Sequence, residues 1–235
     1  MKHIDEKSFI DTVGLYIEGL GDRCMRYYSF DHCYTYFQEH YSELEQKEGV
    51  LDSMALHLFS YLASWGMMRN EFIIQSNFLF HKDVCEIIAK EMDGLYKNPS
   101  TDSLISLGKR IKNIYRDKTF LKLTEGKDGI HMEKKHISKV SDTLVTKILL
   151  GTTGMVPAYD RFVKLAMKEY GISSSFNARS LNLLRDFAKE NESAISKIQK
   201  ENKCVENYPV MKIVDMFLWQ KGYELDKEIK RQKKD

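Results

Sequence analysis

A single carboxylate, Asp160, stands where the sequence predicts the start of a helix. Pro157 suits a first helical turn because its φ angle is fixed and its missing N–H is not needed there. An acid in that turn lies near the positive end of the helix dipole. Such a carboxylate can stabilise a developing positive charge, and it can orient or deprotonate a water molecule. Asp160 is therefore a helix-start residue, a catalytic group, or both.

Basic side chains are concentrated in the second part of the chain. Residues 1–100 contain 9 basic and 16 acidic side chains, whereas residues 101–235 contain 27 basic and 18 acidic ones. The net charge of +2 hides this division. A local basic cluster consists of Lys109, Arg110, Lys112, Arg116, Lys118 and Lys122. The pattern indicates either a solvated helix face or contacts with a polyanion.

The residues around Asp160 carry a resemblance. The segment Val156-Pro-Ala-Tyr-Asp-Arg-Phe-Val163 follows a predicted helix that ends near Gly151. This pattern resembles the helix-hairpin-helix DNA glycosylases, which have a hairpin of the form L-P-G-V-G-x-K-T-A, a helix, and then a V-D-T-H-V segment. Without gaps, Thr143 falls on the threonine of the hairpin, and Asp160 falls on the catalytic aspartate of the family. The match covers about residues 138–163.

The sequence also departs from the family pattern. Ser138 and Val140 replace the glycines of the hairpin, and Ile137 replaces its proline. Asp142 stands where bifunctional members keep a lysine nucleophile, although Lys139 is close by. The resemblance therefore implies a monofunctional enzyme that uses water rather than a Schiff base.

If the resemblance holds, the protein binds DNA, flips a damaged or modified base and hydrolyses its N-glycosidic bond with the help of Asp160. A flipped base needs a pocket with aromatic faces. Candidate pocket residues are Tyr159, Trp65, Gln75 and Trp219. Candidate contacts to the DNA backbone are Lys139, Lys147, Arg161, Lys109, Arg110 and Lys112. We expect no cofactor. The alternatives are a helical nucleic-acid-binding module without enzymatic activity and a helical protein-interaction scaffold.

Two other sequence patterns bear on ligand binding. Residues 151–154, Gly-Thr-Thr-Gly, fit either a phosphate-binding loop or the end of a helix followed by a turn. The second is favoured because the Lys-Ser/Thr ending of a P-loop is absent. No histidine pair has the i, i+4 spacing of a helical zinc site, so we expect no metal.

Hydrophobic spacing predicts helices almost throughout the chain. The sequence has three prolines and 13 glycines, which are few for a chain rich in β-turns. The expected helices include residues 50–65, 72–80, 83–95, 102–114, 141–150, 157–170, 177–200 and 209–231, with a loop or short hairpin at 117–137. The predicted fold class is all-α, with nine or ten helices in one domain, 1–235. The alternative to a single domain is a division into an acidic lobe, 1–98, and a basic lobe, 99–235. Two helical lobes are also what the resemblance to the glycosylases implies.

The remaining sequence features concern the environment of the protein. No apolar run approaches the roughly 20 residues that span a bilayer, and the N-terminal residues do not form an apolar signal segment. Four widely separated cysteines, without a C-x-x-C pair, favour reduced thiols. These features predict a cytoplasmic protein that does not insert into membranes.

Overall fold

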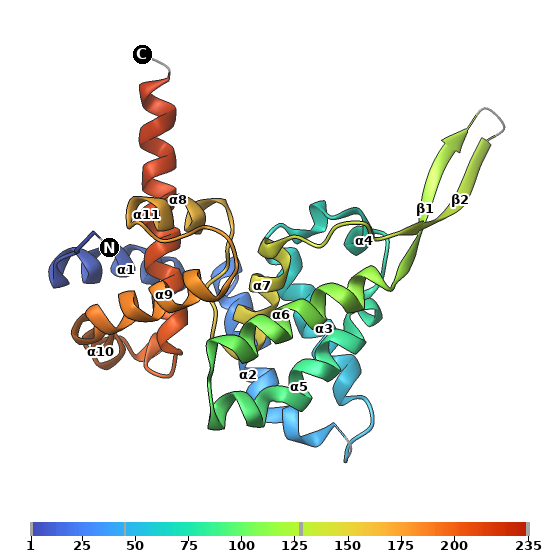
Figure 1. Ribbon diagram of the computed structural model, residues 1–235, viewed down its shortest axis with the longest axis horizontal. Coiled ribbons are helices and arrows are strands. Elements are labelled where there is room, and N and C mark those ends of the chain that lie inside the picture. Colours follow the sequence, from blue (N-terminus) through green and yellow to red (C-terminus); the bar gives the residue numbers. More distant parts are fainter. Residues whose placement is uncertain (1, 45, 127–128, 234–235) are drawn as a thin grey trace. The chain divides into compact units, whose positions relative to one another are not determined.

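The computed structural model describes residues 2–44, 46–126 and 129–233. These residues form eleven α-helices and one pair of strands, joined by short 3-10 turns (Figure 1), which confirms the predicted helical fold. The helices are α1 Glu6–Glu18, α2 Ser29–His40, α3 Val50–Ser64, α4 Glu71–Ile74, α5 Lys82–Lys97, α6 Thr101–Arg116, α7 Asp142–Thr153, α8 Arg161–Glu169, α9 Ala178–Glu190, α10 Glu192–Glu201 and α11 Val210–Gln232. The strands are β1 Thr119–Gly126 and β2 Gly129–His136.

The chain divides into two compact units. Unit 1 comprises the described residues of 1–28 and 153–235, and unit 2 comprises those of 29–152. The first helix and the last four helices therefore belong together, and the intervening segment forms a unit of its own. Neither boundary falls at residue 98, where the predicted acidic lobe ends.

Unit 1 is built on α11, which packs against α1, α8 and α9 (Figure 1). The first turns of α11 are buried almost continuously, from residue 212 to residue 219. Phe217 lies at the centre of this core. Its ring stacks on Phe9 of α1 at a centroid distance of 4.5 Å, and the rings of Tyr170 and Phe187 lie 5.5 and 5.6 Å away. Burial of these aromatic rings is the main apolar contribution to the unit.

Unit 2 is built on α3, which packs against α2 and α5. Leu58 and Leu62 of α3 are completely buried, as are Ile88 of α5 and Ile111 of α6. The strands β1 and β2 form an antiparallel hairpin in which Thr119 pairs with His136. The hairpin confirms one of the two structures predicted for residues 117–137.

Three predicted helices differ from those in the structure. The helix expected at 157–170 begins only at Arg161, because residues 155–160 form an irregular buried segment. The helix expected at 177–200 is two helices, separated at Asn191, whose side-chain amide donates to the carbonyl of Phe187 at 2.8 Å. The helix expected at 72–80 consists of α4 and a separate 3-10 turn, Phe78–His81.

Folding removes most of the charge asymmetry seen along the sequence. Unit 1 contains 20 basic and 17 acidic residues, and unit 2 contains 16 basic and 17 acidic residues. Most of the acidic N-terminal part, residues 29–100, belongs to unit 2, which also contains the basic cluster of residues 109–122. Positive charge is therefore a local property of particular surfaces, not of one unit.

Candidate functional site

Asp160 is the N-cap residue of α8. Its Oδ1 atom accepts hydrogen bonds from the backbone N–H groups of Phe162, at 3.0 Å, and Val163, at 3.1 Å. The side chain is half-buried. The helix-start interpretation of Asp160 is thus confirmed, and the backbone donors of the helix fix the orientation of its carboxylate.

The segment that leads to Asp160 is buried and held by specific hydrogen bonds. Gly154 ends α7 with a left-handed φ of 66°, which confirms that residues 151–154 are a helix end followed by a turn. The N–H of Ala158 donates to Oδ1 of Asp215 at 2.8 Å. The hydroxyl oxygens of Tyr159 and Ser180 are 2.6 Å apart. The two residues before Asp160, Ala158 and Tyr159, are therefore both held in place by hydrogen bonds.

The first turn of α8 is pressed against α11. A Cβ atom on Gly222 would lie 1.9 Å from the carbonyl oxygen of Phe162 and 2.9 Å from its Cα atom. Only a glycine allows the two backbones to approach so closely. The hydrogen bond from Ala158 to Asp215 holds the segment before Asp160 against α11, and the contact with Gly222 holds the segment after it.

A buried charged group supports this arrangement, and sequence reasoning did not find it. Lys212 and Asp215 are 2% and 4% exposed, and their Nζ and Oδ2 atoms are 3.5 Å apart. Nζ of Lys212 also donates to the hydroxyl of Tyr16 at 3.1 Å. The sequence contains a signal for this pair: two opposite charges stand three residues apart within the apolar stretch 210–219. Burial of such charges normally requires that they pair.

Aromatic side chains lie next to the start of α8. The ring of Phe162 makes edge-on contacts with Trp219 and Tyr223, at centroid distances of 5.4 and 5.5 Å. Cationic groups lie over these rings: the guanidinium of Arg26 is 5.4 Å from the centroid of Trp219, and the ammonium of Lys227 is 4.3 Å from that of Tyr223. Buried and half-buried aromatic rings with cationic groups over them therefore lie next to the first turn of α8.

The four predicted pocket residues are divided between the two units, with Tyr159 and Trp219 in unit 1 and Trp65 and Gln75 in unit 2. Tyr159 is completely buried, and its ring meets Phe176 at 5.7 Å. Trp219 is 5% exposed and belongs to the aromatic group beside α8. Trp65 and Gln75 lie in unit 2, where Trp65 packs under the ammonium of Lys147 and Gln75 is an exposed residue at the end of α4.

The predicted DNA-contacting cations differ in exposure. Lys147 is only 3% exposed, so its ammonium does not lie on the surface. Arg161 is exposed and pairs with Asp226, and Arg110 is exposed and pairs with Glu91.

The other three cations lie near the start of α7. Lys112 is 2.5 Å from Asp142, the first residue of α7. Lys109 and Lys139 are exposed and make no ion pair within the described part of the chain. Because Lys109 and Lys112 are three residues apart, they share one side of α6. That side faces the N-terminus of α7, where Ser141 caps the helix by accepting the N–H of Leu144 at 3.1 Å.

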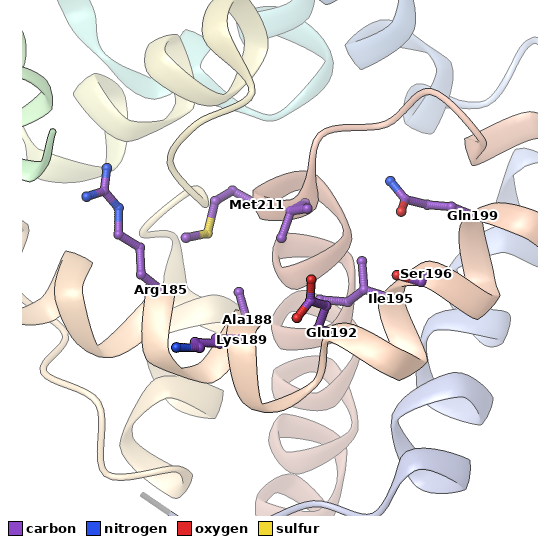
Figure 2. Close-up of a pocket in the computed structure, with 9 residues that line it drawn as sticks. Arg185, Ala188, Lys189, Glu192, Ile195, Ser196, Gln199 and Met211 are labelled. Atoms are coloured by element: carbon purple, nitrogen blue, oxygen red, sulfur yellow. The ribbon is translucent and has the colours of Figure 1, made fainter. Parts of the chain in front are cut away.

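A separate groove opens on unit 1 between α9, α10 and the start of α11 (Figure 2). Its volume is about 490 Å³. Ala188, Ile195 and Met211 form its apolar part, and Lys189 and Glu192 are among the charged groups at its margin. None of its lining residues belongs to the predicted site.

The described residues contain no group of three or more His, Cys, Asp or Glu side chains that could hold a metal ion. Within the same ranges, no helix has both the length and the apolar character needed to cross a membrane. Comparison of the chain with known protein families, curated proteins and solved structures gives no significant match.

Proposed function

We propose that this protein is a DNA-acting enzyme that hydrolyses the N-glycosidic bond of a flipped, damaged or modified base, with Asp160 as the essential carboxylate. The observation that carries the proposal is the fixed position of Asp160. Its carboxylate is oriented by two N–H groups of α8, and the residues before it are held by Asp215 and Ser180. A preorganised carboxylate of this kind is what glycosidic cleavage requires.

The chemistry follows from the charge that develops during cleavage. As the bond between the base and the sugar breaks, positive charge builds on the sugar ring, and a nearby carboxylate lowers the energy of that state. The same carboxylate can orient or deprotonate the attacking water. Asp142, 2.5 Å from Lys112, occupies the position at which bifunctional members of the resembled family have a lysine, which favours a water-dependent reaction.

The path of the chain also supports the proposal. It begins in unit 1, forms unit 2, and returns to unit 1 at residue 153, seven residues before Asp160. Two helical units agree with the two lobes that the resemblance implies. One departure is the strand β2, which ends two residues before Ser138, so a strand precedes the residues aligned with the hairpin of the family.

DNA binding would use cations that are exposed or partly exposed. Lys109 and Lys112 lie on one side of α6, near Lys139 and the start of α7. Arg161 directly follows the proposed catalytic residue and is 64% exposed at its side chain. Contacts of such groups with phosphates release counterions, so binding is expected to weaken steeply as salt increases.

A second function, nucleic-acid binding without catalysis, is favoured by the capping role of Asp160. Its two hydrogen bonds to Phe162 and Val163 stabilise α8 and account for an acid at this position without any chemistry. In that case the cations have the same role, and Asp160 contributes only to the stability of the helix.

Base release from a panel of duplexes with single modified bases separates the two functions. We expect the wild-type protein to release a base, measured by mass spectrometry, and Asp160→Asn to be about 10²–10³-fold slower while binding DNA normally. Asparagine still caps α8, so the fold is preserved. Asp186→Asn, at an exposed position of α9, is the matched control. Salt-dependent binding with no base release on any duplex would favour the second function.

A further inference from the structure

The hairpin of β1 and β2 carries a concentration of exposed apolar side chains. Figure 1 shows both strands running outward from the helices of unit 2. Four large aliphatic side chains on the strands are between 54% and 74% exposed: Leu121, Leu123, Ile130 and Met132. A contiguous exposed patch of this kind marks an interaction surface, whereas single exposed apolar residues do not.

The register of the hairpin places the four side chains on one face. Leu123 pairs directly with Met132, and Leu121 and Ile130 occupy the next positions of the same face on either side. Directly paired residues in an antiparallel ladder point the same way, and so do alternate residues along each strand. We call this continuous surface the apolar face of the hairpin.

The opposite face holds the hairpin to unit 2. Phe120 is 7% exposed, and Nζ of Lys122 is 2.5 Å from Oε1 of Glu71 in α4. Nζ of Lys118, just before β1, is 2.6 Å from Oδ2 of Asp83 in α5. The base of the hairpin is therefore anchored through residues that alternate with the apolar ones, and the apolar face points away from these contacts.

We propose that the apolar face of this hairpin enters a groove of duplex DNA and separates neighbouring base pairs. The choice of DNA as partner rests on the proposed function. The major groove of B-form DNA admits a two-stranded ribbon, whereas that of A-form RNA is too narrow. β-Ribbons also enter the minor groove, from which proteins insert leucine, isoleucine or methionine between base steps to unstack them. This action would assist the extrusion of a base.

Cations on and near the hairpin complement the phosphates that flank such a groove. Lys134 lies on the apolar face itself, paired with Leu121. Arg116 and Lys139 stand just before and just after the hairpin in sequence, and Lys109 precedes Arg116 by two helical turns on α6. These four side chains are exposed, and they form no ion pair within the described ranges. An apolar face that carries one unpaired cation, with further unpaired cations close to both ends of the hairpin in sequence, fits a polyanion with stacked bases.

A second copy of the chain fits this face less well. The face offers four exposed aliphatic side chains, whereas each partner in a standard interface buries about 800 Å². Insertion between base pairs, in contrast, needs only a few side chains.

A lipid bilayer also fits less well. Glu125 pairs with Ile130 on the apolar face, close to the end of β1. Burial of this carboxylate in hydrocarbon is costly. In a DNA groove it can accept a hydrogen bond from the exocyclic amine of cytosine. Glu125 thus opposes insertion into lipid but is compatible with a DNA groove.

The test uses the full chain and a mismatched duplex that carries 2-aminopurine, whose fluorescence rises when it unstacks. We expect wild-type protein to raise the fluorescence severalfold, and the variant Leu123→Ser/Met132→Ser to lose most of this rise. Both substitutions are at exposed positions, so folding is unaffected. Ile74→Ser, at a 62% exposed position of α4, is the matched control and should behave as wild type. Lys134→Gln should lower the slope of log affinity against log salt by about 1.

The outcomes are distinguishable. Equal unstacking by the wild type and the double variant overturns the role of the hairpin and leaves the proposed function intact. Unstacking that depends on the hairpin, without release of any base, supports the role of the hairpin and contradicts the enzymatic function. A third outcome is that the protein binds no DNA, and that the double variant loses either binding to anionic lipid vesicles or a dimer that the wild type forms. This outcome overturns both the role of the hairpin and the proposed function.

Discussion

The backbone N–H of Ala158 donates to Oδ1 of Asp215, 57 residues later in the chain, at 2.8 Å. This hydrogen bond joins the segment before α8 to α11. The same carboxylate lies 3.5 Å from the ammonium of Lys212, which in turn contacts Tyr16 of α1. One buried acid thereby links three parts of unit 1, and the position of Asp160 depends on it.

Removal of this acid should destabilise the protein strongly. We expect Asp215→Ala to lower the free energy of unfolding by about 3–5 kcal/mol, because Lys212 would remain as an uncompensated buried charge. The double variant Lys212→Met/Asp215→Asn should lose much less, since asparagine still accepts from Ala158. Urea denaturation measures both. Glu86→Gln, which breaks an exposed pair with Lys90, should cost below about 1 kcal/mol. A cost this small for Asp215→Ala would contradict the role of the buried pair.

The close approach of α8 and α11 gives a second prediction. Gly222→Ala places a methyl group on the carbonyl oxygen of Phe162, so the two helices must move apart. We expect a loss of about 1–3 kcal/mol or more in the free energy of unfolding. Gly94→Ala in α5 is the matched control, because no atom beyond its chain neighbours and the nearby backbone of its own helix lies within 4 Å of the added methyl group. That variant should gain about 0.5–1 kcal/mol. Similar thermal stability of the two variants would be incompatible with this contact.

A buried histidine in unit 2 should make stability depend on pH. Burial, with the nearby Lys118 ammonium, lowers the pKa of His81 from 6.5 to about 4. Its Nδ1 lies 2.6 Å from the hydroxyl of Tyr115, and its Nε2 has no hydrogen-bond partner among the described residues. Between pH 6.5 and 4 the unfolded chain therefore binds a proton that the folded chain does not. Stability falls as the pH falls through this window, by up to about 3 kcal/mol.

The contribution of His81 can be isolated by substitution. His81→Gln should flatten the dependence of the unfolding free energy on pH between 6.5 and 4, whatever its effect on stability at neutral pH. His131→Gln, at an exposed position of β2, should leave the dependence as in the wild type. Parallel curves for the wild type and His81→Gln, measured by denaturant titration at several pH values, would show that other groups are responsible.

The sequence predicts those parts of the fold that depend on local periodicity. The apolar spacing of residues 50–65 matches α3, Val50–Ser64, because one side of that helix is buried along its whole length. The start of α8 was placed four residues too early, at Pro157. Proline is compatible with a first helical turn, but Asp215 accepts the N–H of Ala158 and keeps this segment out of the helix. Such a contact arises only from folding and leaves no local signal.

The same distinction applies to the candidate site. Asp160 was found because a helix start has a local signature, whereas Lys212 and Asp215 act through contacts with distant elements. The choice of pocket residues rests on residue type, which carries no information about such distant contacts. Large aromatic residues such as Tyr159 and Trp219 were candidates by type, and both are used in the core of unit 1. Residue type alone does not separate a core aromatic from a pocket aromatic.

The two roles of Asp160 can be separated by comparing two substitutions. Asp160→Ala removes the acceptor for Phe162 and Val163 and should cost about 0.5–2 kcal/mol of stability. Asp160→Asn should cost little, because asparagine caps helices as well as aspartate does. Base release should be about 10²–10³-fold slower in both variants, since catalysis requires the negative charge. Equal stability loss in both would contradict the capping role, whereas base release retained by Asp160→Asn would contradict the catalytic one.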